Sequence, residues 1–158
     1  MKKCFSIGAG LMLLSVGAVA QEHTLTMYSK LSQPEYIDIA PQDVSVGDMY
    51  LRRGGMSLTP DGPVVGEYYT QATIVHLDNA QQKSARSFLK EFILPDGSIY
   101  SMDFVQTDHG KPAAGRHTHE GAIVGGTGKY AGIRGTYTLE IAADAKTAKT
   151  TVRYWLGQ

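Results

Sequence analysis

The feature that most constrains this chain is a glycine-dense stretch between two apolar, β-branched runs, residues 122–137. It reads Ala-Ile-Val-Gly-Gly-Thr-Gly-Lys-Tyr-Ala-Gly-Ile-Arg-Gly-Thr-Tyr. Glycine reaches positive φ without a Cβ clash, so such a cluster lets a chain reverse sharply between two strands. We therefore expect a strand–turn–strand unit here, with at least one of Gly125, Gly126 and Gly128 at positive φ.

The Gly-Thr-Gly-Lys segment of this stretch looks like the core of a phosphate-binding loop, but its spacing argues against that interpretation. A phosphate loop needs a glycine, four residues and then Gly-Lys-Ser/Thr. Here Ile123 stands at the first position and Tyr130 follows the lysine. A dinucleotide fingerprint fails as well, because Gly126, Gly128 and Gly132 have the wrong spacing and no helical pattern follows. The stretch predicts a structural turn.

The N-terminus has the pattern of a secretory signal peptide. Lys2 and Lys3 give a positive start, an apolar run covers residues 5–16, and Ala18-Val19-Ala20 is a small-x-small cleavage site. The apolar run is too short for a membrane-spanning helix. We expect cleavage after Ala20 and a secreted or periplasmic product.

Composition narrows the function classes of the remaining domain, residues 21–158. The chain has one cysteine, Cys4, which lies in the predicted signal, so we expect neither disulfides nor thiol chemistry. The full chain has 15 Lys and Arg and 15 Asp and Glu; without Lys2 and Lys3 the domain has 13 basic and 15 acidic residues, and no basic stripe appears. This argues against nucleic-acid binding and against electrostatic docking to a membrane. The length suits one domain with one core.

The domain has the short-period alternation of β-strands, and no segment keeps a helical period. Residues 31–47 are expected to form an arm or loop, and Pro95-Asp96-Gly97 a hairpin turn. One strand is expected to be broken by a bulge at Gly54-Gly55. Many evenly spaced strands indicate a sandwich or a barrel, and periodicity does not choose between them. The expected strands are 25–30, 48–51 with 56–58, 64–77, 86–94, 98–106, 117–124, 133–142 and 148–156.

The glycine-dense stretch resembles the signature of the allene oxide cyclase and dirigent protein barrels, Ile-Val-Gly-Gly-Thr-Gly-Lys-Tyr followed by Ile-Arg-Gly-Thr-Tyr. Residues 46–48 (Val-Gly-Asp) and 61–66 (Asp-Gly-Pro-Val-Val-Gly) resemble the earlier glycine positions of the family in the same order. Glu120 stands where dirigent proteins often have an acidic residue. The resemblance covers residues 44–156. It implies an all-β fold, a single antiparallel eight-stranded barrel with a mostly apolar lumen, often assembled as a trimer.

The resemblance implies a small-molecule function without naming the reaction. Allene oxide cyclases use a glutamate on the first strand, where this chain has Tyr28-Ser29-Lys30. Dirigent proteins usually have an arginine where this chain has Glu67. We expect a barrel that binds a small, largely apolar molecule in its lumen, either as a cofactor-independent cyclase or isomerase or as a non-catalytic binding or assembly module. A homotrimer or homodimer is the expected assembly.

Carboxylates on otherwise apolar strands are the candidate catalytic groups. A carboxylate in the lumen can act as general acid or base, whereas on the outer surface it faces solvent or pairs across strands. Asp103, which lies between Met102 and Phe104, is the first candidate for the lumen, and Glu67 is the second. The candidate ligand-binding residues are Tyr69, Glu91, Tyr100 and Arg134.

Two histidines could form part of a metal site. His117 and His119 lie on one face of a predicted strand, about 7 Å apart along the chain. Such a pair ligates a metal when a third ligand comes from elsewhere. Glu120 points to the opposite face, and the other candidates are His76, His109 and Asp103. With no third ligand evident, we predict that the protein uses no metal and no cofactor, and a metal-binding barrel is the weaker alternative.

Overall fold

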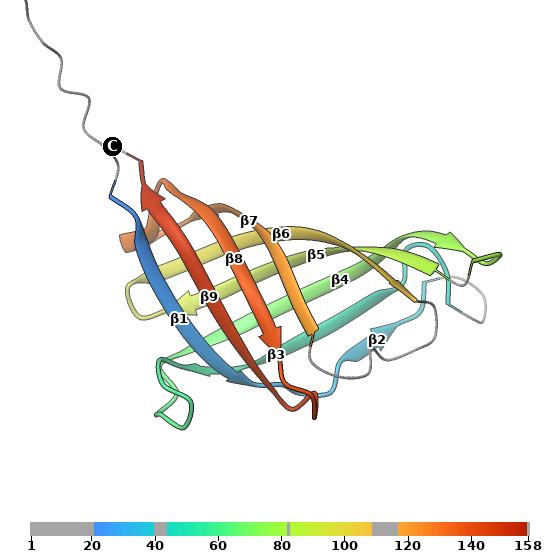
Figure 1. Cartoon of the computed structure of the whole chain (residues 1–158), viewed down its shortest axis with the longest axis horizontal. Helices are drawn as coiled ribbons and strands as arrows, with labels where there is room; N and C mark the ends of the chain where they lie inside the picture. The colour runs from blue at the N-terminus through green and yellow to red at the C-terminus, as the bar shows by residue number, and fades with distance from the viewer. Residues whose placement is uncertain (1–20, 40–43, 82, 109–116, 158) are drawn as a thin grey trace, which may run out of the picture.

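The computed structural model describes residues 21–39, 44–81, 83–108 and 117–157 (Figure 1). The predicted signal peptide and His109 lie outside these ranges. The described part is almost entirely β. No helix in it is long and apolar enough to cross a membrane.

The described residues form nine strands and one short 3-10 helix (η1). Their bounds are β1 His23–Lys30, β2 Glu35–Ile37, β3 Met49–Ser57, β4 Gly66–Asp78, β5 Lys83–Leu94, β6 Gly97–Asp108, β7 His117–Gly126, η1 Gly128–Tyr130, β8 Ile133–Ile141 and β9 Thr147–Leu156.

The strands close into an antiparallel barrel. They follow the order β1-β9-β8-β7-β6-β5-β4-β3-β2, and an additional β1–β3 pairing joins the two sides of the sheet. β1 pairs with the end of β3 through Tyr28–Ser57 and Ser29–Met56, whereas the short β2 pairs with the start of β3. Eight long strands therefore form the barrel, which protects the strand edges from pairing with other chains. The expected barrel is confirmed over the sandwich.

Most strand positions agree with the sequence-based expectation, and β3 is the exception. Residues 49–56 pair without a break with residues 66–73 of β4, so Gly54 and Gly55 form no bulge and the expected broken strand is wrong. A Cβ on Gly54 would lie 2.9 Å from Cε1 of Tyr68. The glycine therefore makes room for a ring packed inside the barrel. The β4–β5 pairing is irregular instead between Ile74 and His76.

The glycine-dense stretch forms the end of β7, η1 and the start of β8. Gly125 and Gly126 belong to the strand, whereas Gly128 has φ +57°, which confirms the expected positive φ. The backbone N–H of Lys129 donates to the carbonyl of Asp96, at 2.8 Å. This bond ties the β7–β8 connection to the neighbouring β5–β6 turn.

The interior is filled by alternate residues of each strand. On β5, Lys90, Phe92 and Leu94 are buried together, as the period of two predicts. The buried apolar core consists of Met27, Met56, Tyr68, Phe92, Leu94, Ile99, Ile123, Tyr130, Ile133, Tyr137 and Val152.

The two ends of the barrel differ. The turn end has the Pro95–Asp96 turn and η1, and the buried ring of Tyr130 packs edge-on against Tyr154 there. At the loop end β4, β6 and β8 finish and β5, β7 and β9 begin. Toward the loop end the side chains of Arg86, Phe88 and His119 are only half-buried. The interior therefore meets solvent at the loop end.

Candidate functional site

Three polar side chains form a hydrogen-bonded cluster inside the barrel: Lys90 of β5, Asp103 of β6 and Tyr137 of β8. Nζ of Lys90 lies 3.1 Å from both carboxylate oxygens of Asp103. The hydroxyl of Tyr137 donates to Oδ2 of Asp103 at 2.6 Å, and it also accepts a short hydrogen bond from Lys90. Each member of the cluster therefore contacts the other two.

The register of the sheet brings these side chains together. Asp103 pairs with Phe88, two residues from Lys90 on the same face of β5. Tyr137 pairs with Gly121 of β7, the strand that separates β8 from β6. A Cβ on Gly121 would lie 2.5 Å from Cε1 of Tyr137 and 2.8 Å from Cβ of Asp103. Because Gly121 has no side chain, Tyr137 reaches across β7 to the carboxylate.

Burial shifts the pKa of two members of this cluster, Lys90 and Tyr137. The exposed fraction is 4% for the Lys90 side chain and 1% for that of Asp103. Burial lowers the pKa of Lys90, and the adjacent Asp103 carboxylate opposes that change. Burial and the hydrogen bond to Asp103 raise the pKa of Tyr137 well above 10, so its phenol stays protonated at neutral pH. The cluster can therefore donate a proton from Tyr137 or Lys90 and accept one at Asp103.

Aromatic rings lie between this cluster and the loop end. The rings of Phe88 and His119 pack with their centroids 5.9 Å apart, and Nζ of Lys90 lies 4.9 Å from the Phe88 ring centroid. Burial, and then the positive charge of Lys90, lower the pKa of His119, so its imidazole is neutral at pH 7. A ligand that entered from the loop end would meet these two rings before it reached the polar cluster.

The structure separates the predicted site residues into two groups. Asp103 lies inside the barrel, and Met102 and Phe104 point outward with exposed fractions of 37% and 69%. Glu67, the second candidate for the lumen, lies on the outer face instead, and so do the four candidate ligand-binding residues Tyr69, Glu91, Tyr100 and Arg134.

Strand alternation explains that outer placement. Tyr68 and Ile99 are buried inside the barrel, which turns their chain neighbours outward. Lys90 and Ile133 are also buried inside, so the side chains that follow them, Glu91 and Arg134, point outward. A catalytic role for Glu67 and a ligand-binding role for the other four residues stay predictions, and these residues could act only outside the lumen.

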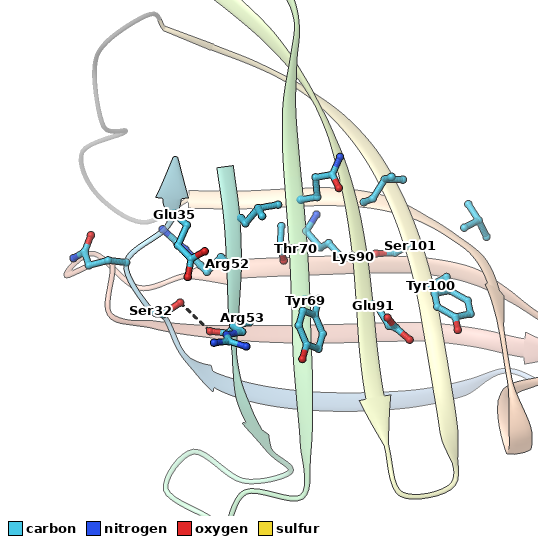
Figure 2. Close-up of a pocket in the computed structure, with 15 residues that line it drawn as sticks. Ser32, Glu35, Arg52, Arg53, Tyr69, Thr70, Lys90, Glu91, Tyr100 and Ser101 are labelled. Atoms are coloured by element: carbon cyan, nitrogen blue, oxygen red, sulfur yellow. Dashed lines mark hydrogen bonds between the residues drawn. The ribbon is translucent and has the colours of Figure 1, made fainter. Parts of the chain in front are cut away.

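Three of the five line a groove on the outer face of β3–β6 (Figure 2). Arg53, Tyr69, Glu91 and Tyr100 are successive register partners, so they form one row across four strands. The groove has a volume of about 760 Å³, and Ser32 of the arm between β1 and β2 lines one side. The Ser32 hydroxyl fixes that side by donating to the carbonyl of Arg53 at 2.8 Å.

The histidine pair lies on β7, where His117 and His119 are half-buried and alternate with the exposed Thr118 and Glu120. Among the described residues, no three His, Cys, Asp or Glu side chains gather closely enough to hold a metal ion. The third ligand that a metal site would need is therefore not supplied by the described part of the chain.

Comparison with known proteins rests on structure, because no protein-family model and no curated protein matches this chain. A pyocyanin demethylase superposes with a TM-score of 0.65 and 24% identity over 84% of this chain and 99% of its own. A pterocarpan synthase dirigent protein superposes with a TM-score of 0.58 and 14% identity over 87% of this chain and 87% of its own. The chain has the allene oxide cyclase and dirigent barrel fold. A Diels–Alderase from Streptomyces koyangensis is also similar, with a TM-score of 0.64 and 13% identity over 90% of this chain and 72% of its own.

Sequence reasoning on this dirigent-like barrel did not single out Lys90 or Tyr137 as site residues. A signal was present for Lys90, which stands between Phe88 and Phe92 on one strand face. A lysine flanked in this way enters the core with its neighbours and then requires a buried carboxylate. The partner, Asp103, and the bridging Tyr137 become evident only from the register of four strands.

Proposed function

We propose that this dirigent-like barrel binds a small, largely apolar molecule at the loop end of its interior and isomerises or cyclises it without a cofactor. The observation that supports this most strongly is the buried Lys90–Asp103–Tyr137 cluster beneath the half-buried rings of Phe88 and His119. Barrels of this fold include proteins named as a Diels–Alderase and a pyocyanin demethylase.

In the proposed reaction the cluster moves one proton and returns another. Asp103 accepts a proton from the substrate, and the Tyr137 hydroxyl donates one at a second position. The proton on Asp103 then passes to the Tyr137 oxygen along their 2.6 Å hydrogen bond, which restores the starting state. Lys90 stabilises the negative charge that develops during these steps. Substrate and product have the same mass.

A non-catalytic binding module is the second candidate, and the packed turn end of the barrel favours it. Phe92, Ile99, Tyr130 and Ile133 are buried together there. On this alternative, the polar cluster orients a ligand by hydrogen bonds and moves no proton.

Mass spectrometry of small molecules distinguishes the two candidates. The protein is incubated with a metabolite extract of the producing organism, and both bound and converted compounds are measured. Conversion to a product of unchanged mass, lost in Tyr137→Phe and kept in Tyr69→Phe, supports the enzyme. Tyr69 is a matched control because its hydroxyl lies on the outer face. A bound compound without conversion supports the module, and neither binding nor conversion contradicts the proposal.

Export and assembly belong to the same proposal. A secreted or periplasmic protein would have lost residues 1–20, and intact-mass analysis should find Gln21 as its first residue. Self-association into a homotrimer or homodimer would cover apolar side chains of the outer face, which is tested below.

A further inference from the structure

Arg86 is a cation in the barrel interior that forms no ion pair with any of the described residues. It lies on β5 between Ser84 and Phe88 and shares the inward face of that strand with Lys90. Its guanidinium carbon lies 4.8 Å from the ring centroid of Tyr50. Its Nε is buried and has no hydrogen-bond partner among the described residues.

The Tyr50 ring, on which the Arg86 guanidinium packs, is an aromatic platform held in place by Tyr36 and Asp48. The rings of Tyr50 and Tyr36 pack with their centroids 5.0 Å apart, and the Tyr36 hydroxyl donates a short hydrogen bond to Asp48. Asp48 is fully buried and also accepts from the backbone N–H of Ser45 at 2.7 Å and of Ile39 at 3.1 Å. The Asp48 carboxylate is therefore satisfied by these donors, whereas Arg86 is oriented by stacking on Tyr50.

Among the described residues, the two inward-facing cations of β5 differ in their partners. Asp103 compensates the charge of Lys90, but none of the ion pairs among the described residues includes Arg86. The guanidinium group of Arg86 is a positive charge. Burying part of a guanidinium without a hydrogen-bond partner costs free energy, and a bound anion would offset that cost.

We propose that Arg86 binds an anionic oxygen group of the lumen ligand, such as a carboxylate, phenolate or sulfonate. The planar guanidinium suits such groups because it donates two parallel hydrogen bonds. The apolar body of the ligand then lies against Phe88 and His119, toward the Lys90–Asp103–Tyr137 cluster. This inference rests on the proposed function, and it narrows the substrate class to apolar molecules with one acidic end.

A pair of fluorescent probes tests the proposal on the full mature protein. 8-Anilinonaphthalene-1-sulfonate and N-phenyl-1-naphthylamine share one ring system, and only the first has a sulfonate. We expect Arg86→Gln to weaken binding of the sulfonate about tenfold and to leave the uncharged probe unchanged. The affinity of Arg86→Lys for the sulfonate should lie between those of the wild type and Arg86→Gln, because lysine keeps the charge and loses the planar donor pair.

Two further variants locate the bound probe. Arg153→Gln removes an exposed arginine from β9 and should change neither affinity. Leu139→Trp enlarges a half-buried side chain that pairs with His119, and it should block both probes. Circular dichroism and thermal melting confirm that each variant is folded.

The possible outcomes distinguish the role of Arg86 from ligand binding in the lumen. If Leu139→Trp blocks both probes but Arg86→Gln weakens both equally or neither, the role of Arg86 is wrong and lumen binding stands. If neither probe binds, or Leu139→Trp leaves both bound, lumen binding fails and the inference fails with it. Selective loss of the sulfonate in Arg86→Gln supports both.

Discussion

The hydroxyl of Tyr137 donates a 2.6 Å hydrogen bond to Asp103, although strand β7 separates the strands that carry them. The two side chains meet over Gly121, the β7 residue that pairs with Tyr137. A catalytic candidate on one strand is thus completed from two strands away. The arrangement depends on the absence of a side chain at a single position.

The first prediction follows from that dependence. In Gly121→Ala the new Cβ would lie 2.5 Å from Cε1 of Tyr137 and 2.8 Å from Cβ of Asp103. We expect a loss of about 1–3 kcal/mol in the free energy of unfolding, measured with denaturant, because the ring has to move. Gly125→Ala is the control, since a Cβ there meets no atom within 4 Å. Equal effects of the two variants would contradict the crowding argument.

The second prediction concerns the buried ion pair. Asp103→Asn leaves the Lys90 ammonium buried without its carboxylate, so we expect a loss of about 3–5 kcal/mol in stability. The double variant Lys90→Met/Asp103→Asn removes both charges and should be more stable than Asp103→Asn alone. Unfolding curves of the two single variants and the double variant complete a cycle. Strictly additive losses would show that the two side chains are not coupled.

Period-two patterns predicted most of the strands of this fold, and they could not say which face of a strand is inside. Tyr68 and Tyr69 are the same residue type on adjacent positions of β4, yet one is buried and the other is exposed. On β6 the large apolar Met102 and Phe104 face outward and Asp103 faces inward. Hydrophobicity alone would have assigned these faces the other way round.

The site required the register of the sheet as well as the faces. Lys90 and Asp103 are on adjacent strands, and their ion pair depends on the β5–β6 register, which places Asp103 opposite Phe88. Tyr137 reaches the same carboxylate only because the β7–β8 connection places it opposite Gly121. The sequence resemblance predicted the barrel, and the residue roles of the named families did not apply to these positions.

The third prediction concerns the outer face of the barrel. Phe104 is 69% exposed and lies on β6, which also exposes Met102, while Leu89 of the adjacent β5 and Val124 of β7 are about half exposed. Such side chains are stabilised when they are covered, so we expect self-association. Phe104→Ser should lower the molar mass of the assembly in light scattering after size-exclusion chromatography. Val64→Ser is the control, because Val64 is 70% exposed in the loop before β4. A wild-type monomer would contradict this prediction.

The fourth prediction concerns acid stability and begins at Asp48. The hydrogen bond from Tyr36, together with those from Ser45 and Ile39, holds the pKa of this carboxylate well below its ordinary value. A group whose pKa is lower in the folded state stabilises the protein above its unfolded pKa, which is about 4 for aspartate. That contribution decreases as the pH falls below about 4, because the unfolded chain then binds a proton more readily than the folded one.

Removing the Asp48 carboxylate should therefore change both the melting temperature at neutral pH and the way in which it falls with decreasing pH. We expect Asp48→Asn to lower the melting temperature at pH 7 and to reduce the further loss between pH 5 and pH 2. Tyr36→Phe removes one donor and should give an intermediate profile. Asp61→Asn, in the exposed loop before β4, should behave as the wild type. If Asp48→Asn and the wild type lose the same melting temperature on acidification, another carboxylate controls the acid response.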